Sequence, residues 1–343
     1  MGHAIVDRIG FVDEAVLAAA ELVKGSMRLV GSVEELLVAG VGEPRWERAA
    51  GSAGNTAAAL ALLGSSVCFV GKVGDDALGA TYRADMGGLG AQVHPDEPVP
   101  AAPTGQCLVL VTPDGERTMS TYLGASTSLG PHDLPPDLVS SARMLYVEGY
   151  LWDSPGAVEA VDAVLGGPVA FALSLSDPFC VQRHRDAFLD LAQNRVGVLF
   201  ANEDEILALT GTADIEGAII AAQGWGCVVA ITRGAAGSVV VKGPFRRDVP
   251  AVEVAEVVDT TGAGDLYAAG FLHALLGSSD PNSSLGGPGL ARCAQLGSVA
   301  AAEIVGHVGA RPLVSLRSLA ARAGLLPPDR GEVPDPSSPK ENE

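Results

Sequence analysis

Basic residues are scarce in this sequence, and they form no extended run. Its 343 residues include 22 Lys and Arg against 41 Asp and Glu, which gives a formal net charge of −19. Nucleic acids and anionic membranes are bound by grouped Lys and Arg side chains, because these neutralise phosphate. The charge balance therefore argues against both partners and leaves a small molecule as the expected ligand.

Paired cysteines and long apolar runs are lacking too. The five cysteines lie far apart, without a Cys-x-x-Cys pair, which predicts reduced thiols in a cytoplasmic protein. The first ten residues lack the basic start and apolar core of a secretory signal. The most apolar stretch, residues 215–232, is interrupted by Gly and Gln, so it predicts a helix, a turn and a strand and not a membrane span.

Several catalytic motifs are missing as well. The six His residues show no metal-ligand spacing, so a zinc enzyme is not expected. Lys72 follows a glycine, but the Gly-x-x-x-x-Gly-Lys-[Ser/Thr] pattern of phosphate-binding loops is absent. The motif set of protein kinases is absent too. These gaps argue against a Walker-type nucleoside triphosphatase and against a protein kinase.

Short apolar runs alternate with segments of helical period along most of the chain. Strands are predicted at residues 67–70, 108–111, 144–147, 169–173, 198–200, 228–232 and 238–241. Helices are predicted at residues 56–63, 76–87, 156–165, 184–192, 215–222, 265–276, 290–305 and 315–321. This alternation predicts an α/β fold with a parallel sheet that is covered by helices on both faces.

Two regions break the alternation. Residues from about 8 to 48 hold a short helical patch at 13–22, and residues 99–125 contain strands joined by a Pro-Asp-Gly turn. We expect both to form a small insertion over one edge of the main domain. Residues 325–343 are rich in Pro and charge, which predicts a disordered tail outside the function.

The run from Asp259 to Asp265 reads Asp-Thr-Thr-Gly-Ala-Gly-Asp and opens an apolar helical segment. A helix start with small residues offers free N–H groups to an anion. An acidic residue at that place would repel an anion, so its presence there indicates a chemical role. The run therefore predicts phosphoryl transfer, with Asp265 handling the proton. The helix start is expected to lower the pKa of Asp265, and a weak base suffices because a loose transition state needs little early proton removal. A plain helix N-cap is the alternative, and the complete run favours the site.

Two further groups of residues suit a polyhydroxylated ligand. Gly51 and Asn55 lie in Gly-Ser-Ala-Gly-Asn, where backbone and side chain approach a ligand together. Asp7 ends an apolar run near the N-terminus, and a carboxylate accepts two hydrogen bonds from a vicinal diol. Turn and capping chemistry explains the first group equally well, and a solvated strand end explains the second.

Two strand ends carry polar residues that suit a nucleotide and its cation. Asn202 and Glu205 follow a predicted strand, and oxygen ligands there suit a water-bridged Mg²⁺. Thr232 and Gly234 follow another strand and suit a nucleotide phosphate. A polar helix start and a turn between strands remain open as the respective alternatives.

These motifs, in this order, resemble those of the ribokinase/PfkB carbohydrate kinase superfamily, in its adenosine kinase-like branch, over about residues 2–312. The resemblance implies a ribokinase-like αβα sandwich with a mainly parallel central sheet. It implies one kinase domain over residues 1–324, with a small β-lid from about 8–48 and 99–125. It also implies transfer of the γ-phosphoryl group of ATP, with Mg²⁺, to a primary hydroxyl. A monovalent cation beside residues 259–264 and a monomeric or homodimeric state stay open.

The resemblance also assigns roles by position. Asp265 matches the catalytic base, and Gly262, Ala263 and Gly264 match the anion hole. The remaining matches are Asp7, Gly51 and Asn55 for the sugar, Arg117 for a lid arginine near phosphate, Asn202 and Glu205 for the Mg²⁺ waters, and Thr232 and Gly234 for the nucleotide.

Local features favour a nucleoside as the acceptor. Tyr150 matches an aromatic residue beside the base, and Leu-Ser-Asp-Pro-Phe at 175–179 is similar to a segment of the adenosine kinase-like branch. The expected reaction is adenosine to AMP, with a ribose or ketohexose kinase and a non-catalytic nucleoside-binding protein as alternatives. The chain departs from the family at His3, where Asn is usual, and at Ala50, where Gly is frequent. It also begins at Met1, so most of the family's first strand is missing: either the start is misassigned or that strand is short.

Overall fold

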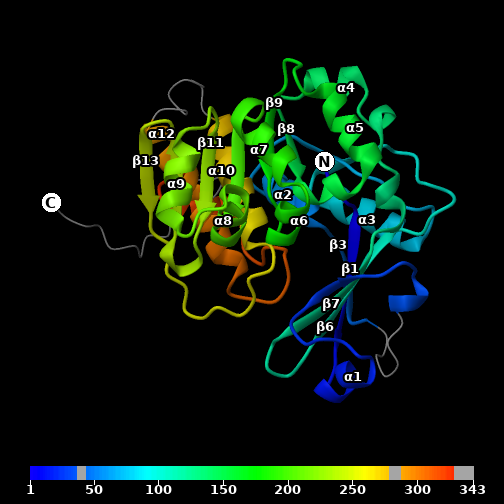
Figure 1. The fold of residues 1–343 in the computed structure, drawn as a ribbon. Coiled ribbons are helices and arrows are strands. Elements are labelled where there is room, and N and C mark those ends of the chain that lie inside the picture. The colour runs from blue at the N-terminus through cyan, green and yellow to red at the C-terminus, as the bar shows by residue number, and fades with distance from the viewer. Residues whose placement is uncertain (37–43, 278–286, 328–343) are drawn as a thin grey trace.

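The computed structural model describes residues 1–36, 44–277 and 287–327. Figure 1 shows a layered α/β body from which a smaller sheet projects. The main sheet has the order β13-β12-β11-β10-β9-β8. Its strands are β8 (Met144–Glu148), β9 (Ala170–Ser174), β10 (Val198–Asn202), β11 (Val228–Thr232), β12 (Ser238–Lys242) and β13 (Phe245–Val249). Strands β8 to β11 are parallel, and β12 and β13 complete the edge in antiparallel pairing.

The sheet continues through the first residues of the chain. The amino group of Met1 donates to Tyr146 O (2.7 Å), and the N–H of Gly2 donates to Val70 O (3.1 Å). Val70 ends β4 (Val67–Val70), which pairs in parallel with β5 (Ala91–His94). Backbone bonds at residues 1–2 thus connect the six-stranded sheet with this parallel pair.

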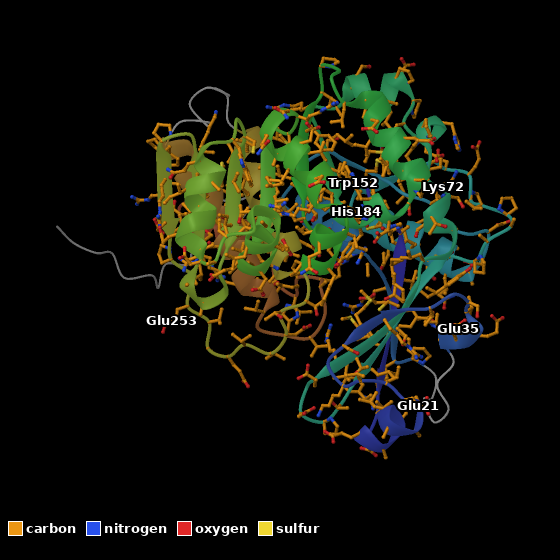
Figure 2. The ribbon with its side chains drawn as sticks, in the orientation of Figure 1. Glu21, Glu35, Lys72, Trp152, His184 and Glu253 are labelled. Atoms are coloured by element: carbon orange, nitrogen blue, oxygen red, sulfur yellow. The ribbon has the colours of Figure 1, made fainter. Side chains whose placement is uncertain are left out.

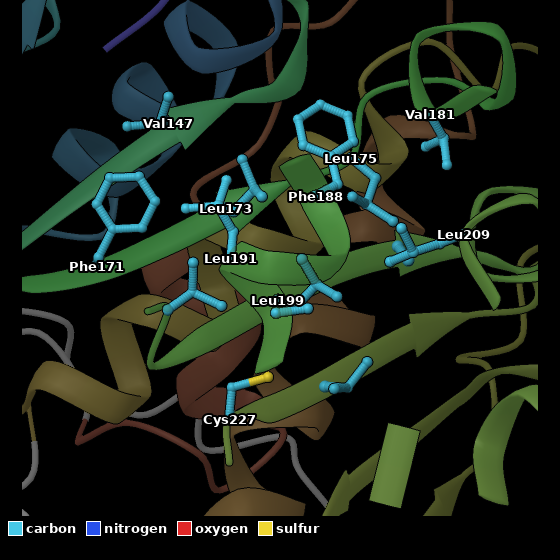
Figure 3. Packing of buried hydrophobic residues seen from close by; sticks show 14 of the residues in the cluster. Val147, Phe171, Leu173, Leu175, Val181, Phe188, Leu191, Leu199, Leu209 and Cys227 are labelled. Atoms are coloured by element: carbon cyan, nitrogen blue, oxygen red, sulfur yellow. The ribbon is translucent and has the colours of Figure 1, made fainter. Parts of the chain in front are cut away.

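Helices cover both faces of the sheet, because its strands are apolar on both sides. One cluster joins Phe171, Leu173 and Leu199 to Phe188 and Leu191, as Figure 3 shows. This face carries α5 (Pro155–Val164), α6 (Pro178–Arg183), α7 (Arg185–Asn194), α8 (Glu203–Thr210) and α9 (Ile215–Gln223). The other face carries α10 (Ala263–Gly277) and α12 (Gly287–Ile304). The predicted sandwich with a mainly parallel sheet is therefore confirmed.

Further helices complete the body. Three of them are α2 (Ser52–Leu62), α3 (Ala77–Gly88) and α13 (Leu316–Arg322). Helices α2 and α3 pack on β4 and β5, with Phe69 and Tyr82 fully buried between them. A short α4 (Pro136–Ser141) precedes β8. Among the described residues, no helix is long and apolar enough to cross a membrane.

The projecting sheet has the order β2-β7-β6-β1-β3. Its strands are β1 (Ile5–Phe11), β2 (Met27–Leu29), β3 (Trp46–Ala50), β6 (Gly105–Val111) and β7 (Arg117–Tyr122), with α1 (Glu14–Ala19) against one side. We call this sheet the lid. Of the alternatives left open for the first strand, a short strand is not observed, since β1 pairs with β6 over all seven of its residues.

Some elements differ from their prediction. Strand β10 continues to Asn202, so this residue ends the strand and caps α8 in place of following the strand. Strands β5 and β13 were not predicted, because their polar residues hide the apolar period. Helix α8 was foreseen only as the alternative of a polar helix start at Asn202 and Glu205. The predicted disordered tail lies outside the described residues from 328 onward.

Helices α10 and α12 approach each other closely through glycine. A Cβ atom on Gly270 would lie 2.6 Å from the carbonyl oxygen of Leu296, and one on Gly297 would lie 2.8 Å from the carbonyl oxygen of Tyr267. These backbone contacts leave no room for a side chain, so the close packing beneath the site requires glycine at both positions.

We expect Gly270→Ala to destabilise the fold by about 1–3 kcal/mol, the usual cost of overpacking. The matched control is Gly87→Ala in α3, where a Cβ atom meets nothing within 4 Å. That change is expected to stabilise by about 0.5–1 kcal/mol, because alanine loses less entropy on folding. Urea unfolding measures both, and equal effects would contradict this account of the helix contact.

Candidate active site

The loop before α10 takes its shape from Gly262. This residue has φ +80°, and a Cβ atom there would lie 2.8 Å from Cβ of Ala310. Both facts require glycine, since L side chains avoid this backbone region. Helix α10 begins at once, with the N–H of Leu266 donating to Gly262 O at 2.8 Å. A Cβ atom on Gly264 would meet nothing within 4 Å, so open space lies beside the helix start.

The carboxylate of Asp265 is held from both sides by the first turn of α2. The hydroxyl of Ser52 donates to Oδ1 at 2.6 Å, and Nδ2 of Asn55 donates to Oδ2 at 2.9 Å. Positions 52 and 55 share one helix face, so both reach the same carboxylate. Thr56 adds a bond from its hydroxyl to the backbone carbonyl of Asp265 at 3.2 Å. The two helix starts therefore face each other across one carboxylate.

Burial sets the pKa of Asp265. It raises that pKa to about 7, against the bonds from Ser52 and Asn55, which lower it; the charge of Glu148 raises it further. The expected lowering by the helix start was wrong, because desolvation outweighs it. A pKa near 7 suits a residue that accepts a proton at neutral pH.

Asp259 connects the loop before α10 to the lid. Its Oδ1 accepts from the N–H of Thr261 (3.0 Å), and its Oδ2 accepts from the N–H of Gly309 (2.8 Å). Arg117, on lid strand β7, places Nη2 2.7 Å from Oδ2 of Asp259 and donates from Nη1 to Thr261 Oγ1 at 3.1 Å. The loop thus lies against a lid residue, and the charge of Arg117 is engaged by Asp259. Its predicted approach to phosphate stays a prediction.

Asp7 lies in the middle of β1, opposite Arg48 and Cys107 on the neighbouring strands. Among the described residues, none donates a hydrogen bond to its carboxylate. Burial raises its pKa to about 6, while Arg311 and Arg117 lower it. A carboxylate with both oxygens unoccupied is available to a ligand, although its role with a diol stays a prediction.

Gly51 joins the lid strand to α2. Its φ is +86°, and a Cβ atom there would lie 2.3 Å from the carbonyl oxygen of His3. Only glycine allows this approach, which sets the start of α2 beside β1. The imidazole of His3 is itself buried, and its Nδ1 lies 2.9 Å from Oγ of Ser126.

Asn202 and Glu205 form a capping box at the start of α8. The backbone N–H of Asn202 donates to Oε2 of Glu205 (2.9 Å), and its Nδ2 donates to Oε1 (2.7 Å). Burial raises the pKa of Glu205 to about 7. A dication nearby would lower that pKa, because an opposite charge favours the ionised form. Because the capping bonds already engage both side chains, a water-bridged Mg²⁺ would have to contact them outside these bonds. The Mg²⁺ role of the two residues stays a prediction.

Thr232 and Gly234 lie beside this capping box. Strand pairing sets Thr232 opposite Asn202, at the carboxyl ends of β11 and β10. Gly234 has φ +53°, and a Cβ atom on it would meet nothing within 4 Å. The neighbouring Arg233 pairs with Glu203 at 3.1 Å. The two strand ends are thus brought together, as the topology of a parallel sheet requires.

Tyr150 lies in the short helix Gly149–Asp153 and is partly buried against the main cluster. Its hydroxyl donates to Ser176 O at 3.4 Å, and burial, then Asp177, raises its pKa. The ring is therefore held at the carboxyl end of β9. Stacking on a purine stays a prediction.

Lys72, the lysine that follows a glycine without a phosphate-loop motif, pairs with a buried carboxylate. Its Nζ lies 3.1 and 3.2 Å from the two carboxylate oxygens of Asp133. Figure 2 shows Lys72 on the body, and Glu21 and Glu35 on the lid.

Three residues of this region escaped sequence reasoning. Ser52 lies in the same Gly-Ser-Ala-Gly-Asn motif as Asn55, and its position three residues before Asn55 could have indicated that both face the site. Glu148 is fully buried and accepts from the N–H groups of His3 and Ala53, each at 2.7 Å. Arg311 donates to Oδ1 of Asn55 at 2.6 Å across 256 positions of sequence, and no local pattern announces it.

Comparison with known proteins identifies the family. The family described as "pfkB family carbohydrate kinase" matches residues 25–316. The solved adenosine kinase from Sinorhizobium meliloti is 41% identical, with a TM-score of 0.83 over 94% of this chain and 97% of that chain. A probable sugar kinase from Rhizobium etli CFN 42 is 40% identical, with a TM-score of 0.84 over 95% and 97%. An ATP-dependent ribose-1-phosphate kinase from Halopiger xanaduensis is 31% identical over 68% of this chain and 76% of its own length.

The chain belongs to the pfkB family of carbohydrate kinases. It is accordingly a phosphotransferase with an alcohol group as acceptor, and its substrates are nucleosides or sugars. Membership implies ATP as the phosphoryl donor, generally with Mg²⁺.

The raised pKa of Asp265 has a consequence for stability. The folded chain keeps this proton up to a pH of about 7, whereas the unfolded chain loses it near 3.8. The folded state binds more protons in that window, so its stability falls as the pH rises through it. In Asp265→Asn, the free energy of unfolding should change less between about pH 5 and about pH 8 than in the wild type. Denaturant titrations at both pH values measure this, and an unchanged difference would contradict the assignment.

Proposed function

We propose that this chain transfers the γ-phosphoryl group of ATP to the 5′-hydroxyl of a nucleoside, with adenosine as substrate and AMP as product. The observation that carries the proposal is the Asp265 carboxylate. It lies at the start of α10 beside the loop of Gly262, it is bonded by Ser52 and Asn55, and its pKa is near 7. A positioned base next to an anion-binding helix start is the pair of groups that phosphoryl transfer needs.

Each residue then has a task. Asp7 accepts hydrogen bonds from the 2′ and 3′ hydroxyls, which presents the 5′-hydroxyl to Asp265. Asp265 accepts the proton of that hydroxyl as its oxygen bonds to phosphorus, while ADP leaves. The N–H groups of residues 262–264 stabilise the charge on the transferred group. Mg²⁺, when bound with ATP, would offset charge on the phosphates, and we assign Asn202 and Glu205 the ordering of its waters.

The lid belongs to the same proposed domain, which spans residues 1–324. Asp7 and Arg117 are both lid residues, and Arg117 contacts the anion loop through Asp259 and Thr261. Closure of the lid over the nucleoside excludes water and suppresses hydrolysis of ATP.

Adenosine is favoured by three observations. Tyr150 and residues 175–179 are similar to the nucleoside branch, and the adenosine kinase from Sinorhizobium meliloti covers nearly the whole chain at 41% identity. A sugar or sugar phosphate is the second candidate, because the Halopiger relative is named a ribose-1-phosphate kinase and the Rhizobium etli neighbour a probable sugar kinase.

Replacing Asp265 by Asn should lower kcat by about 10²-fold or more, the scale of a positioned proton acceptor. Steady-state ADP formation measures it, with KM for ATP expected to change little because the loop backbone is retained. Asp186→Asn, an exposed carboxyl on α7, is the control. Near-normal turnover of Asp265→Asn would refute the role of the base.

A substrate panel separates the candidates. ADP formation is measured with adenosine, cytidine, inosine, guanosine, ribose, ribose 1-phosphate and fructose, and we expect the highest kcat/KM for adenosine. Preference for ribose or its phosphate over every nucleoside would reverse this ranking. Nucleoside binding by calorimetry without ADP formation from any compound would support the non-catalytic alternative.

A further inference from the structure

Arg311 reaches the site from the segment that follows α12. It contacts three elements at once: Nη1 donates to Oδ1 of Asn55 at 2.6 Å, Nη2 donates to the carbonyl of Ala49 on β3, and Nη2 lies 3.9 Å from Sδ of Met86 in α3. Its Nε is buried without a hydrogen-bond partner among the described residues. A guanidinium buried in this way loses its hydration, which costs free energy. A structural or functional role has to explain that cost.

The guanidinium decides which way the amide of Asn55 points. Arginine only donates, so the atom of Asn55 that faces it must be the carbonyl oxygen. Nδ2 then faces Oδ2 of Asp265, to which it donates at 2.9 Å. A flipped amide would oppose its NH₂ group to the guanidinium and its oxygen to a carboxylate, which makes two repulsive contacts. Arg311 therefore fixes the donor that orients Asp265.

The charge of Arg311 also reaches two carboxylates of the site. It lowers the pKa of Asp7 and that of Asp265, in both cases against burial. The other charged groups that face Asp7 are Arg117, which lowers its pKa, and Asp259, which raises it. Glu148, from β8, raises the pKa of Asp265. The groups that act on Arg311 itself are Tyr82, Asp85, Asp7 and Asp265.

We propose that Arg311 is a positioning residue, which fixes the amide of Asn55 and so holds the Asp265 carboxylate in the orientation that accepts the substrate proton. This inference rests on the proposed function, because it gives Asp265 the role of base. In this proposal Arg311 acts through Asn55 and not on the acceptor hydroxyl or on phosphate.

Three substitutions separate its hydrogen bond from its charge. Arg311→Met removes both, Arg311→Lys keeps the charge, and Arg311→Gln keeps a neutral donor towards Asn55. In Arg311→Met we expect kcat to fall about tenfold or more, with KM for ATP within about twofold, since orientation of the base is lost. The acid limb of kcat should move to higher pH by about half a unit to one unit, because a nearby positive charge is gone.

The two conservative variants should split these effects. Arg311→Lys should restore the acid limb, whereas Arg311→Gln should recover much of kcat and keep the shifted limb. Arg195→Met is the control, because it removes an equal charge from an exposed pair with Asp190 on α7. Circular dichroism and thermal unfolding establish that each variant is folded. If Arg311→Met does not fold, the Lys and Gln variants carry the comparison.

A readout without turnover distinguishes this inference from the proposed function. Infrared difference spectra against Asp265→Asn follow the ionisation of Asp265 without ATP, and we expect it at higher pH in Arg311→Gln. A folded Arg311→Met with wild-type kcat and acid limb would overturn the positioning role. A rise in KM alone would also overturn it, because that indicates direct substrate contact. If Asp265→Asn stays active, the proposed function itself fails, whatever the Arg311 variants do.

Discussion

The carboxylate of Asp265 is the constraint on which the site depends. It lies where α10 begins, and the first turn of α2 donates to both of its oxygens. Burial at this place opposes ionisation, while the two donors favour it, and the balance leaves a pKa near 7. Helix α2 is rich in alanine, and its small side chains allow the close approach to α10 that these short bonds require. The position of the Asp265 carboxylate therefore depends on how α2 packs against α10.

The lid depends on the same loop through a second buried interaction. Arg117 and Asp259 are both nearly inaccessible, so each charge needs the other. Asp259 also accepts two backbone N–H groups, one from its own loop and one from Gly309. The loop before α10 therefore joins the lid to the start of α10 and to the segment that carries Arg311. Asp7, on lid strand β1, lies near the same junction, because the charges of Arg311, Arg117 and Asp259 all act on its pKa.

Sequence patterns predicted much of the fold because apolar periods are local. The central strands β4 and β11 lie where they were expected, since continuous apolar runs mark buried parallel strands. Strand β13 was missed because its exposed arginines break the run, and α8 was foreseen only as an alternative because three acidic residues fill its first turn. Of the four residues that act on Asp265, only Asn55 was named from the sequence, whereas Ser52, Glu148 and Arg311 were not. Glu148 and Arg311 lie far from Asp265 in the sequence, and hydrophobic periodicity cannot predict contacts between such distant positions.

The sequence alone determined the reaction class. The Asp-Thr-Thr-Gly-Ala-Gly-Asp run is local: a glycine with positive φ, a helix start and an acidic residue need only neighbouring positions to define them. Tertiary structure decided how the acidic residue behaves. The helix start alone favours a low pKa for Asp265, but burial raises it, and the nearest donors and charges come from positions 52, 55, 148 and 311. A pKa depends on everything within a few ångströms in space, and only the folded chain brings those groups together.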